Sequence, residues 1–266
     1  MHAFCEEKGY VCGFIPLVGS TQRDGRDRDR VWWVMGQSLS EEEKRPIELG
    51  ASPSDANYVL IFMHGLGDTG FGFSDTFRYA SGKLSHFRFV LPTADVRPVT
   101  INMGFQMPAW YDIFGLSEDS PEDEDGIKKS AEQIMALIQH EEEEHNIPSE
   151  NILLGGFSQG GAVAMYTALT STKKLGGLVL MSSYLPLNKT FPEAASKHCA
   201  HMPAFQGHGE LDNMVPFRFG KLTCEKLKEL ELQVDFHPYP GVQHTLAPTE
   251  TDDMIRWLQE HFPAEN

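Results

Sequence analysis

One serine in the chain lies in a context that is typical of a nucleophile. Gly156-Phe157-Ser158-Gln159-Gly160 matches the pattern G-x-S-x-G, in which the serine occupies a tight turn between a strand and a helix. Such a turn strains the backbone of the serine, and the flanking glycines leave room for the neighbouring strand and helix. A chance glycine-rich turn would give the same five letters. A nucleophile therefore requires a base, an acid and an oxyanion hole elsewhere in the chain.

A candidate acid and a candidate base follow the serine in chain order. Asp212 comes after the predicted strand 201–206, and His244 comes after the predicted strand 233–239. Active sites of parallel sheets lie at the carboxyl ends of the strands, so both side chains are expected at the same edge as Ser158. His244 would take the serine proton and pass it to the leaving group, while Asp212 would orient the imidazole and stabilise its cation.

A glycine-rich loop at 64–70 follows a continuous apolar run and predicts an oxyanion hole. Glycines let the backbone N–H groups of such a loop approach a ligand closely. We expect the N–H groups of Leu66 and Gln159 to bind the oxyanion, each contributing about 3 kcal/mol. Another histidine, His208, is expected to order the loop that carries Asp212.

The segment between residues 98 and 114 is rich in large apolar side chains. Its two prolines and one glycine argue against a regular helix. Apolar side chains outside regular structure can line a groove for an acyl chain, and methionines adapt to flexible ligands. The alternative is that the segment simply packs on the core. The acyl-binding candidates in this segment are Ile101, Met103, Phe105, Met107 and Trp110.

These residues must be positioned by strands that alternate with helices. Apolar runs predict strands at 58–63, 87–92, 151–154, 175–181, 201–206 and 233–239. Helices are predicted between and after these strands at 126–145, 161–169, 217–230 and 249–262. This alternation predicts the α/β class, with a mostly parallel central sheet and helices on both faces. The domain is expected to span residues 57–266.

Residues 1–56 differ from the rest and are expected to form a mostly irregular N-terminal extension. The short apolar run 31–34 is an exception that could pack on the domain or on a membrane surface. Residues 35–40, MGQSLS, match the N-myristoylation pattern. If translation starts at Met35, the acyl group would be attached to Gly36. The alternative is that this internal match is a coincidence.

The composition predicts a globular chain and excludes several classes of partner. Hydrophobic residues make up 41% of the sequence, and the formal net charge is -16. This charge argues against nucleic-acid binding and against general adhesion to anionic lipid. No apolar run reaches the ~20 residues that span a bilayer, and no signal-peptide pattern is present. We expect a cytoplasmic protein without a transmembrane segment that could touch membranes transiently.

The four cysteines show neither a C-x-x-C pattern nor a metal-binding spacing. Reduced thiols are therefore expected, and no metal or other cofactor is needed for the chemistry described above. Cys5 and Cys12 are further candidates for S-acylation, on weaker grounds than Gly36.

Several motifs occurring in one order resemble the acyl-protein thioesterase/lysophospholipase branch of the phospholipase–carboxylesterase family. The resemblance runs from about Tyr58 to the C-terminus. It implies an α/β-hydrolase fold and removal of palmitoyl groups from protein cysteines, with hydrolysis of lysophospholipids or small esters as the alternative. By this resemblance, Ser158, Asp212 and His244 match the catalytic triad of the family. The segments that carry it are 64–70 (HGLGDTG), 97–100 (RPVT), 115–117 (GLS), 122–127, 155–161 (GGFSQGG) and 208–216.

The sequence departs from that family pattern in two places. Residues 1–56 have no counterpart in it. The segment 184–187 (YLPL) keeps the usual Leu-Pro-Leu, which makes Leu185 a further acyl-binding candidate. Tyr184, however, stands where the family usually has tryptophan, which affects the expected shape of the substrate channel but not the chemistry.

Overall fold

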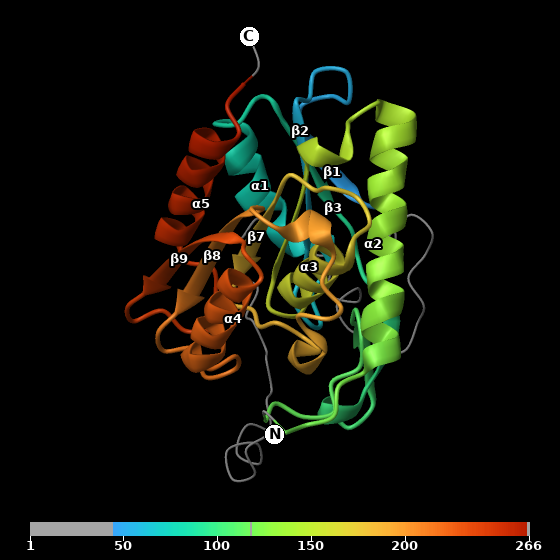
Figure 1. Cartoon of the computed structure of the whole chain (residues 1–266), viewed down its shortest axis with the longest axis vertical. Helices are drawn as coiled ribbons and strands as arrows, with labels where there is room; N and C mark the ends of the chain where they lie inside the picture. Colours follow the sequence, from blue (N-terminus) through green and yellow to red (C-terminus); the bar gives the residue numbers. More distant parts are fainter. Residues whose placement is uncertain (1–44, 118, 265–266) are drawn as a thin grey trace, which may run out of the picture.

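A seven-stranded sheet crosses the molecule in the order β1-β3-β2-β6-β7-β8-β9 (Figure 1). The computed structural model describes residues 45–117 and 119–264. All neighbouring strands pair in parallel except β1, which pairs antiparallel with β3 at one edge. The strands are β1 (Ile47–Gly50), β2 (Tyr58–Met63), β3 (Phe87–Leu91), β6 (Ile152–Phe157), β7 (Gly177–Met181), β8 (Pro203–Gly209) and β9 (Gln233–Tyr239).

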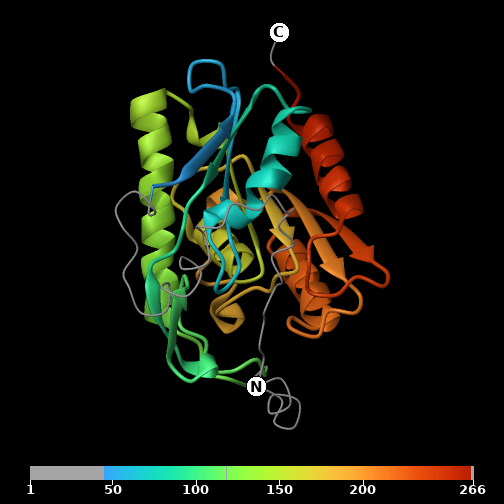
Figure 2. The same cartoon turned by 180° about the vertical axis from the view of Figure 1, so that it is seen from behind.

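Helices cover both faces of this sheet. Helices α2, α3 and α4 lie on the face seen in Figure 1, and α1 and α5 lie on the opposite face, seen in Figure 2. The helices are α1 (Ser74–Ser81), α2 (Glu124–His145), α3 (Gln159–Thr170), α4 (Phe217–Glu229) and α5 (Pro248–His261). Short 3-10 turns occur at Gly70–Phe73, Thr100–Asn102, Ser149–Asn151, Asn188–Thr190 and Lys197–Cys199.

Each strand supplies both halves of the core because its side chains alternate between the two faces. In β2, Val59 and Ile61 belong to the cluster under α2 and α3, whereas Leu60 and Phe62 belong to the cluster under α1 and α5. A strand buried on both faces needs apolar residues at every position, which explains the continuous apolar run. The predicted α/β fold, with a mostly parallel sheet between two helical layers, is confirmed.

Two short strand pairings lie where irregular structure was expected. Strand β1 falls within the stretch assigned to the N-terminal extension, and each of its residues pairs with β3. Strands β4 (Val96–Val99) and β5 (Phe105–Pro108) form a separate antiparallel hairpin inside the segment rich in apolar side chains. Left-handed backbone conformations at Met103 and Gly104 turn the chain between them. Prolines at both strands did not prevent pairing, because a two-stranded hairpin has only edge positions.

Among the described residues, none of the helices has the length and apolarity that crossing a bilayer requires. Cys199 and Cys224 are buried, unpaired thiols. The candidate lipidation sites at Cys5, Cys12 and Gly36, and the apolar run 31–34, lie outside the described residues.

One carboxyl group is buried between α5 and β8. Glu250 has no exposed surface, and its Oε2 accepts the N–H of Ala247 at 3.4 Å. Its Oε1 has no hydrogen-bond partner among the described residues and packs against the backbone of Gly207. Burial raises the pKa of Glu250 to about 8, and the charges of Asp253 and Asp212 act in the same direction. Glu250 is therefore protonated at neutral pH.

This burial predicts a loss of stability on the alkaline side. A folded-state pKa above the unfolded value of about 4.3 gives stability that is fully present at low pH and disappears as the pH rises through about 8. The lowered pKa values of the buried His64 and His208 act only below about pH 6.5, where unfolded histidine titrates. Burial also raises the pKa values of Asp68, Glu122 and Cys199, so a substitution is needed to separate the contribution of Glu250 between pH 6.5 and 8.

We expect the free energy of unfolding to fall by about 2 kcal/mol between pH 6.5 and 8 in the wild type, at about 1.4 kcal/mol per pH unit. Glu250→Gln mimics the protonated acid and should flatten this slope, whereas the exposed Glu225→Gln should leave it unchanged. Urea unfolding followed by tryptophan fluorescence at both pH values measures the slope. Equal slopes in wild type and Glu250→Gln would contradict the assignment.

Candidate active site

The turn between β6 and α3 holds Ser158 in a strained backbone conformation with a positive φ. Its φ is 53° and its ψ is -118°, a combination that costs a non-glycine residue on the order of 1–3 kcal/mol. A side chain at Gly156 would lie 2.3 Å from the backbone of Gly160, and one at Gly160 would lie 2.2 Å from the carbonyl oxygen of Met63. Only glycines therefore let the strand and the helix approach closely enough to form this turn.

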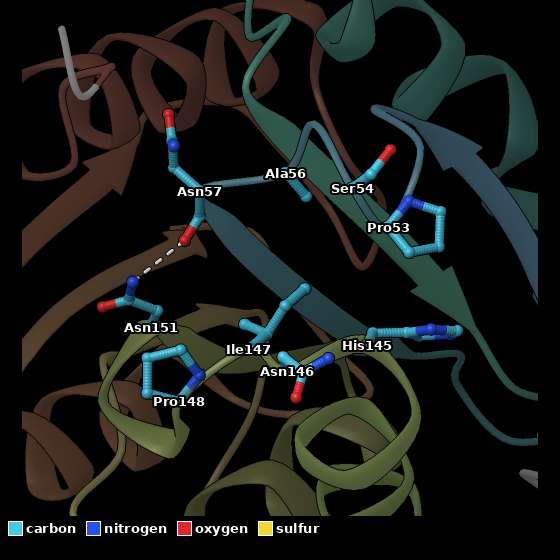
Figure 3. A pocket seen from close by; sticks show the side chains of 9 residues that line it. All are labelled: Pro53, Ser54, Ala56, Asn57, His145, Asn146, Ile147, Pro148 and Asn151. Atoms are coloured by element: carbon cyan, nitrogen blue, oxygen red, sulfur yellow. Dashed lines mark hydrogen bonds between the residues drawn. The ribbon is translucent and has the colours of Figure 1, made fainter.

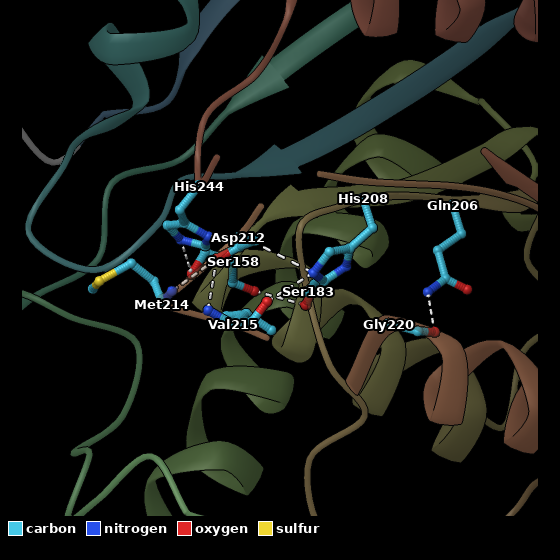
Figure 4. Close-up of polar contacts among 9 residues, drawn as sticks. All are labelled: Ser158, Ser183, Gln206, His208, Asp212, Met214, Val215, Gly220 and His244. Carbon is cyan, nitrogen blue, oxygen red and sulfur yellow. Dashed lines mark hydrogen bonds and ion pairs between the residues drawn. The ribbon is translucent and has the colours of Figure 1, made fainter. Parts of the chain in front are cut away.

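Three side chains from separate loops meet in front of this turn (Figure 4). His244 Nε2 lies 2.9 Å from Ser158 Oγ, and His244 Nδ1 lies 2.7 Å from Asp212 Oδ2. The side chain of Asp212 is fully buried, while 17% of the His244 side chain remains exposed. A carboxylate accepts the Nδ1 proton, which leaves Nε2 free to accept the proton of the serine hydroxyl. The arrangement can remove a proton from Ser158.

The second oxygen of Asp212 is held by the backbone. Its Oδ1 accepts the N–H groups of Met214 at 2.9 Å and of Val215 at 2.8 Å. His208 donates its Nε2 proton to the carbonyl oxygen of Val215 at 2.8 Å, and burial lowers the pKa of His208, which keeps it neutral. This hydrogen bond fits the ordering role expected for His208. The turn directs one carboxylate oxygen toward His244 and fixes the other.

The two expected oxyanion donors flank the serine. Gly65 packs against the turn, because a Cβ placed on it would lie 3.5 Å from Ser158 Cβ. The N–H of Leu66 makes no hydrogen bond to another described residue. Gln159 is the first residue of α3, so its N–H has no acceptor within the helix. Both N–H groups are therefore available to a ligand, and their role as oxyanion donors stays a prediction.

The loop that carries Leu66 is fixed by its own histidine. His64 Nε2 accepts the N–H of Ala94 at 3.0 Å, and His64 Nδ1 donates to the carbonyl oxygen of Gly65 at 2.7 Å. Burial lowers the pKa of His64 to about 4, so the ring is neutral at physiological pH. The N–H of Gly67 donates to the carbonyl oxygen of Pro108 at 2.9 Å. This bond joins the loop to the end of the β4–β5 hairpin.

The six acyl-binding candidates lie in different environments. Met103 and Phe105 are 71% and 53% exposed near the tip of the hairpin. Ile101 and Met107 are half-buried. Met107 lies beside the oxyanion loop, since its sulfur would be 3.6 Å from a Cβ on Gly67. The remaining two, Trp110 and Leu185, are only 3% and 4% exposed.

Two contacts at the site had not been predicted from the sequence. Ser183 Oγ donates to the carbonyl oxygen of Ser158 at 2.7 Å. Its position just beyond the carboxyl end of β7, next to β6, is the signal that could have identified it. Tyr184, the departure from the family pattern, shares a 2.7 Å hydrogen bond with the hydroxyl of Tyr111. This pair joins the segment after β5 to the Leu-Pro-Leu segment.

A hollow lies at the amino ends of β2 and β6, at the opposite end of the strands from Ser158 (Figure 3). One polar contact crosses it, from Asn151 Nδ2 to the carbonyl oxygen of Asn57 at 3.0 Å. Across residues 45–117 and 119–264, no group of three or more His, Cys, Asp or Glu side chains is arranged to hold a metal ion. The absence of a cofactor requirement stays a prediction.

Comparison with known proteins identifies the family. The model of the Phospholipase/Carboxylesterase family matches residues 47–262. Acyl-protein thioesterase 1 of Mycosarcoma maydis is 41% identical over 221 residues, which cover 78% of this chain and 92% of that protein. Acyl-protein thioesterase 1 of Gibberella zeae is 41% identical over 217 residues, covering 78% and 92%.

A solved structure of a related protein has the same fold. The crystal structure of Zea mays acyl-protein thioesterase 2 superposes with a TM-score of 0.73 at 28% sequence identity, covering 82% of this chain and 98% of that one. The resemblance drawn from the sequence motifs is thereby confirmed. The chain belongs to the phospholipase/carboxylesterase family.

Proposed function

We propose that this protein is an acyl-protein thioesterase, which hydrolyses the thioester between a palmitoyl group and a protein cysteine. The observation that carries the proposal is that His244 lies within hydrogen-bond distance of both Ser158 and Asp212. Relatives named acyl-protein thioesterase support the choice of a thioester as substrate.

The first half of the reaction transfers the acyl group to the serine. His244 Nε2 takes the hydroxyl proton as Ser158 Oγ attacks the thioester carbonyl. The N–H groups of Leu66 and Gln159 stabilise the oxyanion that forms. The carbon–sulfur bond then breaks, and the proton on His244 passes to the leaving cysteine sulfur. Asp212 stabilises the imidazolium throughout and keeps its own charge.

The second half releases the fatty acid. His244 takes a proton from water, whose oxygen attacks the carbonyl carbon of the acyl-serine. The same two N–H groups hold the second oxyanion, and the serine oxygen leaves with the proton from His244. The enzyme returns to its starting protonation state. The chain's own residues supply every proton transfer in both halves.

The acyl half of the substrate would lie against the apolar candidates described above. Met107, beside the oxyanion loop, is the candidate best placed to contact the first carbons of the chain. The runner-up function, a lysophospholipase or general carboxylesterase, uses the same acyl contacts and the same triad. It differs in the leaving group, since a thiolate leaves more readily than an alkoxide.

Steady-state kinetics on a palmitoylated peptide and on a lysophospholipid test both ideas. We expect a higher kcat/KM on the peptide, and we expect Ser158→Ala to abolish hydrolysis of both, with a loss of at least about 10³-fold. Ser183→Ala is the matched control because it lies one hydrogen bond away and should retain much of the activity. Preference for the lipid would favour the runner-up, and an active Ser158→Ala variant would refute the nucleophile.

We further propose a cytoplasmic enzyme that touches the membrane with its active-site edge. Ile47 pairs with Leu91, the last residue of β3. The chain therefore enters the described fold near the carboxyl ends of the parallel strands, where Ser158 also lies. Any lipid on Gly36, Cys5 or Cys12 would be tethered to this edge. A single acyl chain binds a bilayer only marginally, and stable association needs a second signal. Exposed apolar side chains near this edge, including Phe71 and Phe105, could supply it.

Intact-mass measurement of the native protein tests the lipid, and sedimentation with zwitterionic vesicles tests the surface. An N-terminus at Gly36 carrying a fatty acyl group is the expected result. Phe105→Ser should reduce vesicle binding of the acylated protein several-fold, whereas Leu222→Ser, which removes a similarly exposed apolar side chain on α4, should not. An N-terminus without any acyl group, or equal binding by both variants, would contradict the proposal.

A further inference from the structure

The side chain of Gln159 is buried and uses both of its polar groups. It is 1% exposed. Its Oε1 accepts the N–H of Trp110 at 3.0 Å, and its Nε2 donates to the carbonyl oxygen of Tyr111 at 2.8 Å. These two bonds attach the segment after β5 to the first turn of α3. The residue expected to donate its backbone N–H to the oxyanion therefore also holds a neighbouring segment with its side chain.

Trp110 carries the connection onward to the oxyanion loop. Its indole N–H donates to the carbonyl oxygen of His64 at 2.9 Å, and its ring lies 5.2 Å from the His64 ring. Ser130 Oγ on α2 donates to the Trp110 carbonyl oxygen, so the backbone of Trp110 is fixed from a third side. His64 lies two residues before Leu66, the other expected oxyanion donor.

The connection through Trp110 matters because the two donors belong to different elements. Strands β2 and β6 pair up to Met63 and Gly156. Past that point, no hydrogen bond between described residues joins loop 65–69 directly to residues 158–161. The polar connection between the donors therefore runs through the segment 108–111: Gln159 holds Trp110, the Trp110 indole holds His64, and the carbonyl oxygen of Pro108 accepts the N–H of Gly67.

We propose that the Gln159 side chain and the Trp110 indole are positioning residues that set the separation of the two oxyanion donors. This inference rests on the proposed function, because it takes the N–H groups of Leu66 and Gln159 as the oxyanion hole. Such donors act only when both lie about 2.7–3.1 Å from the charged oxygen. A displacement of about 1 Å at a catalytic group can lower the rate by about a hundredfold. Loss of the connection should therefore affect the transition state more than substrate binding.

Two variants interrupt the path at different points and leave both backbone N–H groups in the chain. Gln159→Leu removes both side-chain hydrogen bonds, and Trp110→Phe removes only the donor to His64. On a palmitoylated peptide we expect kcat to fall about 10- to 100-fold while KM changes less than about threefold. Ser158 adds to the carbonyl of a trifluoromethyl ketone with an apolar chain, and the adduct carries an oxyanion that mimics the tetrahedral intermediate. The affinity of this ketone should therefore weaken by the same factor as kcat.

Gln206→Leu is the matched control. Gln206 is also buried, at 2% exposure, and its Nε2 donates to the carbonyl oxygen of Gly220 at 2.8 Å, in a contact that lies apart from the Ser158–His244–Asp212 group (Figure 4). This variant should lose stability in urea unfolding as Gln159→Leu does, but it should keep its kcat and its ketone affinity. If Gln159→Leu does not fold, Trp110→Phe alone gives the test.

The outcomes separate this inference from the function on which it rests. A wild type that a fluorophosphonate does not label at Ser158 would refute the proposed function. With labelling intact, unchanged kcat in the two variants would overturn the positioning role. A fall in kcat without the matching loss of ketone affinity, or an equal fall in Gln206→Leu, would also overturn it, because a purely structural effect would then suffice.

Discussion

The site depends on the strained backbone at Ser158. A non-glycine residue at φ 53° persists only where the surrounding structure holds it, and here β6 and α3 supply that hold on either side. Strand β6 ends at Phe157, so Ser158 lies at the carboxyl ends of the parallel strands. Helix α3 begins at the next residue, Gln159, with no linker between strand and helix. This abrupt change of direction exposes the hydroxyl and leaves the first N–H of the helix without an intrahelical acceptor. Nucleophile and anion donor thus arise from one turn.

The parallel sheet explains why distant residues meet at that turn. Strands β2, β6, β8 and β9 all end at the same edge, so the loops that follow them carry Leu66, Ser158, Asp212 and His244 to one place. The loops that carry Leu66 and Asp212 are each held by the hydrogen bonds of a buried neutral histidine. His64 and His208 are both fully buried with lowered pKa values, which keeps both rings neutral while His244 exchanges protons.

Much of this could be predicted from the sequence because it depends on local patterns and chain order. Continuous apolar runs mark β2 and β7 since both faces are buried, and the glycines around Ser158 have a steric cause that the pattern records. Strand β1 escaped prediction because an edge strand of four residues includes Glu48 and Gly50 and lacks a continuous apolar run. The β4–β5 hairpin was not predicted because both of its strands contain a proline. Proline is compatible with a strand only where its nitrogen faces away from a partner strand, as it can in a two-stranded hairpin.

Side-chain roles were harder to predict than strands, for a physical reason. Trp110 is an acyl-binding candidate because it is large and apolar, and the structure adds that its indole N–H and its backbone are hydrogen-bonded inside the core. An amphipathic ring satisfies either environment, so composition cannot distinguish them. The same holds for Gln159, whose side-chain partners lie about fifty positions away in the chain. Only the folded arrangement shows that such contacts surround the reaction centre.

The central claim is that Ser158 receives the acyl group from a thioester. Rapid acid quenching of the enzyme with a palmitoylated peptide, followed by digestion and mass spectrometry, tests it most directly. The account predicts a palmitoyl ester on Ser158, with the free thiol appearing before the fatty acid. Fatty-acid release without an acyl group on Ser158, or with the acyl group on another residue such as Ser183, would contradict it.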